Sequence, residues 1–173
     1  MPNDINIKNT IKPFDKIISI EGDKSLSIRW ALLASQAEGK SKSTNLLKSE
    51  DVISTLTCLR KLGVKLKYSK NVCEIKGVGL NGYKYKNNIK LDAGNSGTLG
   101  RLIMGLLIHS KNKIKLVGDK SLSKRDFLRV VSPLEKFGAK FKTNSGKLPI
   151  IIKGTNNPKK IKYIENKGSA QCK

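Results

Sequence analysis

The segment CLRKLGVKLKYSKNVCEIKG, residues 58–77, has a second version later in the chain, PLEKFGAKFKTNSGKLPIIIKG, residues 133–154. Each segment begins with the end of an amphipathic helix, passes through a glycine, and continues as two stretches that alternate apolar and polar residues. Alternation with a period of two is typical of strands with one buried face. The helix-ending glycines, Gly63 and Gly138, lie about 75 positions apart. The sequence therefore predicts a repeated structural unit.

The predicted order of elements in each unit is βαβαββ. In the second helix of the first unit, Val52, Leu56 and Leu59 recur at the spacing of one helix face. For this unit, about residues 19–80, the expected elements are a strand at 16–20, a helix at 26–37 stopped at Gly39, a strand near 43–47, a helix at 50–62, and strands at 64–68 and 72–76.

The second unit, about residues 86–154, is predicted to have the same order. Its expected elements are a strand at about 88–91, a helix after Gly97, a strand at 113–117, a helix at about 124–137, and strands at 139–143 and 148–153. The sequence Ser132-Pro133-Leu134-Glu135 within the second helix has the form of a helix start, with Pro at the first helical position. We therefore expect the helix to kink or restart there.

A third unit begins near the end of the chain, at residues 160–173, where GSAQ at Gly168 follows GNSG at Gly94 by about 74 positions. This division leaves residues 1–18 as a separate N-terminal segment and residues 19–173 as an incomplete repeat domain. An incomplete repeat domain is expected to leave one side of its core uncovered. We interpret the chain as part of a longer reading frame.

The charge of the chain admits two interpretations. Its net charge is +22, with 35 lysine and arginine residues against 13 acidic ones, which is typical of proteins that bind nucleic acid or other polyanions. The alternative is that lysine simply occupies every solvated face, because the positive charge is spread evenly along the chain. Aromatic residues make up 5% of the sequence, whereas single-strand binders combine their charge with aromatic stacking platforms. The second interpretation is favoured.

The composition also excludes several classes of protein. No run approaches the roughly 18 apolar residues of a membrane span, and the first residues lack the apolar region of a secretory signal. The three cysteines are far apart and the single histidine, His109, lies in an apolar run. This pattern argues against a zinc site or a disulfide framework and predicts a cytoplasmic protein.

Glycine-containing turns precede several of the predicted helices. GDKSLS occurs at Gly22 and again at Gly118, GNSG at Gly94, and GSAQ at Gly168. A turn that leads into a helix directs free backbone N–H groups and the positive end of the helix dipole at whatever lies ahead, which favours an anion. Lysine and arginine in these turns would add charge and bidentate hydrogen bonds. Any one such turn is more often only a cap, but their repeated register predicts a site for an anionic ligand.

These motifs have a counterpart in a known family. GDKSLSIR, LDAGNSGTLGRL, GDKSLSKR and GSAQCK, in this order and spacing, resemble the N-terminal part of the 5-enolpyruvylshikimate-3-phosphate (EPSP) synthase family. The resemblance covers nearly the whole chain. It implies the enolpyruvyl transferase fold, an inside-out α/β barrel in which two domains of three βαβαββ units enclose the active site. It also implies transfer of enolpyruvyl from phosphoenolpyruvate to the 5-hydroxyl of shikimate 3-phosphate with release of phosphate, in the shikimate pathway to chorismate and aromatic amino acids.

The resemblance also implies roles for individual residues. Lys24 and Arg125 would be catalytic, by neutralising the charge of the reactants and holding them in attack geometry. Shikimate 3-phosphate would be bound by Lys24, Ser25, Arg29, Ser169, Ala170 and Gln171. Phosphoenolpyruvate would be bound by Lys24, Asn95, Gly97, Arg125 and Gln171. No cofactor or metal is expected.

Departures from the family pattern concern neighbours of these residues. Glu21 and Asp126 stand where proline is usual, and Asp126 places a carboxylate beside Arg125 that is expected to weaken its hold on an anion. The family's glyphosate sensitivity is decided at the position of Gly97, whereas Ala170 matches a form often found in tolerant members, so the response is left open.

Two alternative functions remain at this point. One is the related enolpyruvyl transferase that acts on UDP-N-acetylglucosamine, and the other is a basic nucleic-acid-binding module. The expected partners are the two small-molecule substrates, with neither a membrane nor a specific nucleic acid. The full-length protein is expected to be a monomer, and this chain alone is expected to show no turnover.

Overall fold

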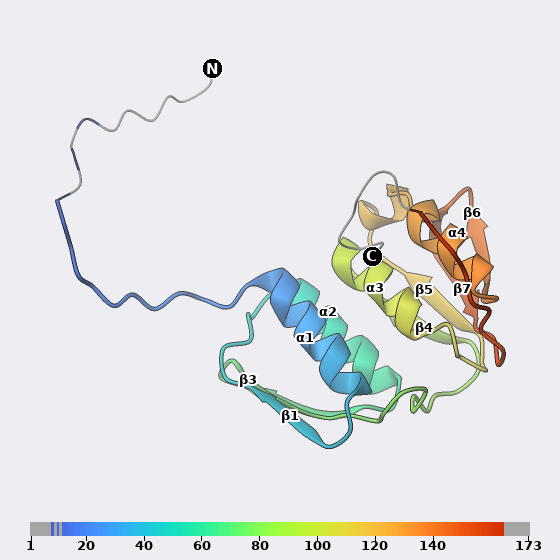
Figure 1. Ribbon diagram of the computed structural model, residues 1–173, viewed down its shortest axis with the longest axis horizontal. Helices are drawn as coiled ribbons and strands as arrows, with labels where there is room; N and C mark the ends of the chain where they lie inside the picture. Colours follow the sequence, from blue (N-terminus) through green and yellow to red (C-terminus); the bar gives the residue numbers. More distant parts are fainter. Residues whose placement is uncertain (1–7, 9, 11, 165–173) are drawn as a thin grey trace.

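The computed structural model describes residues 8, 10 and 12–164, and within them two units follow one another along the chain (Figure 1). The first unit contains α1 (Lys24–Gln36), β1 (Lys40–Ser43), α2 (Glu50–Lys61), β2 (Lys65–Ser69) and β3 (Val72–Lys76). The second contains β4 (Ile89–Asp92), α3 (Gly97–Leu106), β5 (Ile114–Val117), the 3-10 turn η1 (Leu122–Lys124), α4 (Leu128–Lys136), β6 (Lys140–Asn144) and β7 (Lys147–Lys153).

Each unit ends in a hairpin with a two-residue turn. The central residues are Lys70 and Asn71 in the first hairpin and Ser145 and Gly146 in the second, and all four have positive φ angles between 47° and 74°. Positive φ at both central positions is the backbone of a type I′ turn, which matches the twist of the two strands that it joins. The repeated alternating segments therefore fold as the sequence predicts, with boundaries shifted by about one residue.

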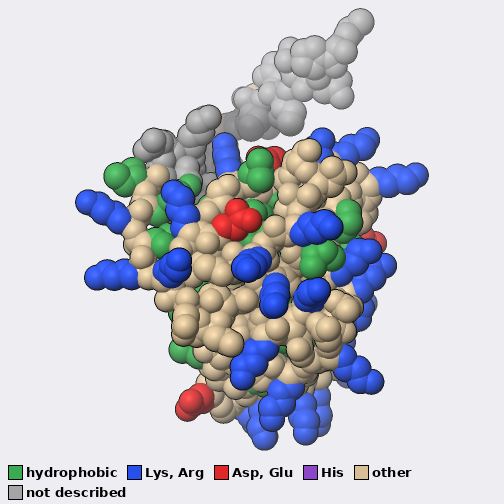
Figure 2. Space-filling view, turned by 90° about the vertical axis from the view of Figure 1, so that its right-hand side faces the viewer, with side chains coloured by type: hydrophobic (Ala, Val, Ile, Leu, Met, Phe, Trp, Pro, Cys, Tyr) green, Lys and Arg blue, Asp and Glu red, His purple; other side chains and the backbone are tan. Residues whose placement is uncertain are grey.

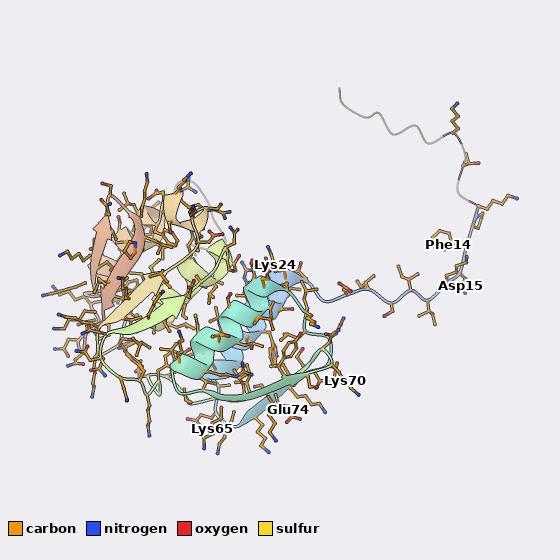
Figure 3. The ribbon with its side chains drawn as sticks, turned by 180° about the vertical axis from the view of Figure 1, so that it is seen from behind. Phe14, Asp15, Lys24, Lys65, Lys70 and Glu74 are labelled. Atoms are coloured by element: carbon orange, nitrogen blue, oxygen red, sulfur yellow. The ribbon has the colours of Figure 1, made fainter. Side chains whose placement is uncertain are left out.

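The two sheets are built alike except for one strand. The first has the order β1-β3-β2 and is antiparallel throughout, and the second has the order β4-β5-β7-β6, in which β4 and β5 run parallel. The strand expected at 16–20 would be the counterpart of β4, and this prediction is wrong. Residues 16–20 form no strand, and Ile17, Ile18 and Ile20 are largely exposed. Within the described residues they pair with no other strand, and Figures 1 and 3 show the chain from Phe14 and Asp15 onward to this segment extending away from the folded body.

The helices pack on one face of each sheet and against each other. α1 contacts both α2 and α3, so the two units share a continuous core in which Ile28, Leu59, Leu99 and Ile103 are fully buried. One face of α1 has no cover in the described part of the chain, since Leu26 and Leu33 are 67% and 68% exposed. The two leucines are seven positions apart and therefore lie on the same side of the helix. Within the described residues, this side of α1 is therefore open to solvent.

Two boundaries in the chain differ from prediction. The strand expected near 43–47 is β1, at 40–43. Beyond its end, Asn45 Nδ2 donates to the Ile20 carbonyl and the Leu47 N–H donates to Ser27 Oγ, so these residues face α1 and the segment before it. The single helix expected at about 124–137 is interrupted by an extended Arg125, and α4 begins only at Leu128. The interruption therefore lies upstream of Pro133, and α4 continues through that proline without restarting.

The outer faces of the sheets carry rows of basic side chains. Lys40, Lys76 and Lys65 stand directly opposite one another on β1, β3 and β2, and Lys42 and Lys67 flank Glu74 in the next row. Figure 3 shows Lys65 and Glu74 on the side of this sheet that faces away from the helices. Figure 2 shows many basic and few acidic side chains over the side of the molecule that includes β6. The charge is thus spread over solvated faces, as the favoured interpretation of the composition predicts.

Candidate anion-binding site

Two turns meet at the carboxyl ends of the parallel strands β4 and β5. The last residues of these strands, Asp92 and Val117, are opposite each other, and the pairing extends into the turns. The Ala93 N–H donates to the Val117 carbonyl at 2.9 Å, and the Asp119 N–H donates to the Gly94 carbonyl at 2.9 Å. The GNSG and second GDKS motifs, 24 positions apart in sequence, are therefore neighbours in space. Loops at the carboxyl ends of parallel strands are frequent ligand sites.

The first of these turns leads directly into α3. Gly94 has a φ of +55°, a conformation that glycine adopts without strain, and Ser96 caps the helix by accepting from the Leu99 N–H at 3.2 Å. Gly97 is the first helical residue and is buried. A Cβ there would lie 2.8 Å from Arg101 Nη1 and 3.1 Å from Arg125 Nη1. The missing side chain thus leaves room for two guanidinium groups beside the start of α3.

The two GDKS motifs are the same capping device, as predicted, but only one begins an α-helix. Asp23 accepts from the Leu26 N–H at 2.7 Å and starts α1. Asp119 accepts from the Leu122 N–H at 2.6 Å and starts only the three-residue η1 turn. The prediction that Gly118 introduces the second helix of its unit is therefore wrong. The short turn instead ends at Arg125 and presents that residue on an extended backbone.

Arg125 belongs to a hydrogen-bonded chain of three exposed side chains. Its Nη2 lies 3.5 Å from Asn95 Oδ1, and Asn95 Nδ2 donates to Asp119 Oδ2 at 2.6 Å. The hydrogen bond from Asn95 lowers the pKa of the Asp119 carboxyl, with smaller contributions from the Leu122 N–H and the Arg125 charge. Of the predicted phosphoenolpyruvate ligands, Asn95, Gly97 and Arg125 are thus brought together.

The predicted ligands on α1 form a second group. Lys24 lies at the start of α1 (Figure 3) and pairs with Asp51 of α2 at 3.2 Å, and its side chain remains 53% exposed. Arg29 Nη1 donates to the Ser25 carbonyl at 3.3 Å, one turn earlier on the same helix. The first turns of α2 lie near both the α1 ligands and the turn at Gly94. Asp51 of α2 pairs with Lys24, and a Cβ on Gly94 would lie 3.1 Å from Oγ of Ser54, also on α2.

The Asp126 carboxylate is hydrogen-bonded away from Arg125. It accepts from the Leu128 N–H at 2.8 Å, at the start of α4, and within the described residues no ion pair or hydrogen bond joins it to Arg125. The Asp126 carbonyl accepts from Arg101 Nη2 at 2.9 Å. Arg101 also lies over the ring of the fully buried Phe127, 4.9 Å from its centroid. The segment that carries Arg125 is therefore fastened to the core immediately after it.

Several site residues were not predicted, and others fall outside the described residues. Asp119, Asp51 and Arg101 hold predicted ligands in place but were not singled out in the sequence. A cap at Asp119 was foreseeable from the GDKSLS motif, whereas its bond to Asn95 required the pairing of β4 with β5. The predicted ligands Ser169, Ala170 and Gln171 lie outside the described residues.

Two negative findings apply to the described part of the chain. It contains no group of three or more histidine, cysteine or acidic residues arranged to hold a metal ion. It also contains no helix of the length and apolarity needed to cross a membrane.

The fold defines a class of protein, the α/β proteins built of repeated units of helices and strands that each end in a hairpin, here with basic side chains near the starts of α1 and α3. Comparison with known proteins places the chain within this class. The family model of EPSP synthase (3-phosphoshikimate 1-carboxyvinyltransferase) matches residues 8–173, and the chain belongs to this family. This finding confirms the resemblance seen in the sequence and the predicted fold class.

Individual relatives agree with the family match. The chain is 44% identical over 169 residues to the 3-phosphoshikimate 1-carboxyvinyltransferase of Ruthia magnifica and 46% identical over 156 residues to that of Vesicomyosocius okutanii. These matches cover 96% and 90% of the chain but 39% and 36% of the relatives. An EPSP synthase structure from Acinetobacter baumannii superposes with a TM-score of 0.84 at 37% identity, covering 90% of the chain and 35% of that structure. The chain thus spans little more than a third of the length of these relatives.

Proposed function

We propose that the chain supplies the part of a 3-phosphoshikimate 1-carboxyvinyltransferase that binds the anionic groups of phosphoenolpyruvate and shikimate 3-phosphate. The observation that carries the proposal is the cluster of Asn95, Gly97 and Arg125 at the end of β4 and β5. The family membership supports the identity of the substrates, and the relatives of both the sequence and the structure bear this name. Neither the UDP-N-acetylglucosamine enzyme nor a nucleic-acid-binding module is favoured by these findings.

The two groups of residues divide the work of binding. Arg125 offers a planar fork of N–H donors, which matches the oxygen atoms of a phosphate or carboxylate bidentately. Because Gly97 has no Cβ, the Arg125 guanidinium lies close to the start of α3, where one anion would contact both the arginine and the first N–H groups of the helix. Lys24, already held by Asp51, would contact both substrates, and Ser25 and Arg29 would bind shikimate 3-phosphate. Ser169, Ala170 and Gln171 would complete that half of the site.

In the proposed reaction the 5-hydroxyl of shikimate 3-phosphate attacks C2 of phosphoenolpyruvate while C3 takes up a proton. The tetrahedral intermediate then loses a proton from its C3 methyl group and expels phosphate from C2, which restores the double bond and leaves the enolpyruvyl ether. Lys24 and Arg125 would act by neutralising the phosphate and carboxylate and by keeping the reacting atoms in line. The groups that move the protons are expected in the part of the relatives that this chain does not span. A cytoplasmic location and a monomeric full-length protein remain predictions.

The proposal is tested by binding and by reconstitution. Phosphoenolpyruvate together with shikimate 3-phosphate should bind the chain, measured by calorimetry, whereas UDP-N-acetylglucosamine should not. Adding the separately produced remainder of the Ruthia magnifica relative should then give phosphate release, and Arg125→Ala should abolish it. Phosphate release by this chain alone would contradict the division of function proposed here. Equal binding of the two acceptors would contradict the choice of substrate.

A further inference from the structure

Asp119 has more hydrogen bonds than a cap requires. Its Oδ1 accepts from the Leu122 N–H at 2.6 Å and its Oδ2 accepts from Asn95 Nδ2 at 2.6 Å. Its backbone N–H donates to the Gly94 carbonyl, and its carbonyl accepts from the Ser123 N–H, each at 2.9 Å. The residue is therefore fixed at both backbone and side chain, although its side chain is exposed. A carboxylate with both oxygens hydrogen-bonded keeps a fixed position even when it is exposed, and it therefore orients the side chains that bind to it.

The bond from Asn95 determines which way that side chain presents its amide. Because a carboxylate only accepts, Asn95 must turn its NH2 group toward Asp119. Its oxygen then faces Arg125, 3.5 Å from Nη2. The other terminal nitrogen of Arg125 lies beside the bare backbone of Gly97. The carboxylate thus acts on the arginine through one intervening amide.

We infer that Asp119 is a positioning residue that fixes the Asn95 amide and, through it, holds the Arg125 guanidinium across Gly97 ready for an anion. The inference rests on the proposed function, because it assigns a role within the same phosphoenolpyruvate site. Asp119 lies within the GDKSLSKR motif, but the ligand set that the resemblance implies does not contain it.

The twin motif provides a matched control. Asp23 occupies the same place in GDKSLS and caps Leu26 with the same geometry, at 2.7 Å. Within the described residues, Asp23 shows no second hydrogen bond through its carboxylate to a distant side chain. Replacing either aspartate by asparagine keeps the size of the side chain and an oxygen for the cap. Only at position 119 does the replacement place an NH2 group against the NH2 group of Asn95.

Asp119→Asn should therefore make the Asn95 amide rotate, so that its NH2 group faces the guanidinium of Arg125. Loss of one charge-assisted hydrogen bond weakens binding by about tenfold. Removing the negative charge of Asp119 should in turn raise the affinity for the anion about twofold, and salt suppresses this gain. The expected result is a phosphoenolpyruvate Kd raised about fivefold at low salt and somewhat more at high salt. Asp23→Asn should change it by less than twofold.

The experiment uses the 15N-labelled full chain and two readouts. In the wild type, the side-chain amide signal of Asn95 should be displaced by its bond to a carboxylate, and it should move in Asp119→Asn but not in Asp23→Asn. The Arg125 Nε signal should move with it. Titration with phosphoenolpyruvate then gives the three dissociation constants. Because the amide and guanidinium signals are read without ligand, they test the inference even if the wild type fails to bind, an outcome that would contradict the proposed function instead.

A double-mutant cycle separates positioning from a general structural effect. If Asp119 acts through Asn95, the variant with both Asn95→Ala and Asp119→Asn should bind phosphoenolpyruvate about as weakly as Asn95→Ala alone. Additive losses, or Asn95 and Arg125 signals that Asp119→Asn leaves in place, would overturn the inference. Urea unfolding of each variant checks that the fold is retained.

Discussion

Truncation of Phe127 to alanine tests whether the core supports the segment that carries Arg125. The Phe127 side chain is fully buried, and a Cβ on Gly100 would lie 3.2 Å from its ring. Removing a buried phenylalanine side chain costs about 3–5 kcal/mol, since burial is lost and a cavity remains. The cation–π contact with Arg101, 4.9 Å from the ring centroid, is lost as well. We expect the free energy of unfolding to fall by about 4 kcal/mol and Tm to drop by about 10 °C.

The assay is urea unfolding followed by two probes. Far-UV circular dichroism reports on both units, and the fluorescence of the single tryptophan, Trp30, reports on α1 in the first unit. Because α1 contacts α3, the two transitions should coincide and should shift together in the variant.

The neighbouring residue is the control. Leu128 is 45% exposed, so Leu128→Ala should cost less than about 1 kcal/mol. A loss in Phe127→Ala no larger than that in Leu128→Ala would refute the reasoning, because it would show that the ring does not anchor this part of the core. A shift in circular dichroism without a shift in Trp30 fluorescence would show that the two units do not unfold as one.

Three further predictions concern the site, a thiol and the surface. Gly97→Ala should weaken phosphoenolpyruvate binding several-fold in calorimetry, because its Cβ would lie 3.1 Å from Arg125 Nη1 and push the guanidinium aside. Burial raises the pKa of the Cys58 thiol from 9.0 to about 11, so the folded chain holds this proton more tightly than the unfolded chain. Stability in urea should therefore fall as the pH rises through that interval, and less steeply in Cys58→Ala. Lys76→Glu should raise stability by up to about 1 kcal/mol at low salt, because both cross-strand neighbours are lysines, and this gain should vanish at 0.5 M salt.

Each of these three has a result that would contradict it. Unchanged binding in Gly97→Ala would mean that Arg125 has room elsewhere. A pH profile that is the same with and without Cys58 would mean that its thiol titrates alike in the folded and unfolded chains. A salt-independent effect of Lys76→Glu would mean that its cause is not charge.

The local pattern of the sequence was enough to predict most of the fold. Alternation and helical spacing located the hairpins and helices because both signals depend on neighbours within a few positions. The strand expected at 16–20 failed for the opposite reason. Its apolar residues fit a strand, but a strand also needs a partner for its backbone, and no described residue supplies one. The helix-start pattern around Pro133 does not divide α4, which continues through that proline, and the expected kink stays a prediction.

The site was predictable in its parts but not in its connections. The resemblance predicts Asn95, Gly97 and Arg125 as ligands, and the structure brings these three residues together. The motifs could not show that Asp119 holds Asn95, since that contact depends on the parallel register of β4 and β5. They also suggested that Asp126 opposes Arg125, whereas the carboxylate is directed at the Leu128 N–H.

The two type I′ hairpins have a consequence for the order in which the chain folds. The turns at Lys70-Asn71 and Ser145-Gly146 join strands that are adjacent in sequence, and such hairpins close within about 1–10 μs. The parallel pair β4–β5 must instead wait for α3 to cross between its strands, which costs loop entropy before any contact is gained. We therefore expect native-state formation to begin at the hairpin ends of both units. The turns that hold Asn95 and Asp119 would become ordered last. A mutant that folds slowly would therefore acquire its secondary structure before it is able to bind its ligand.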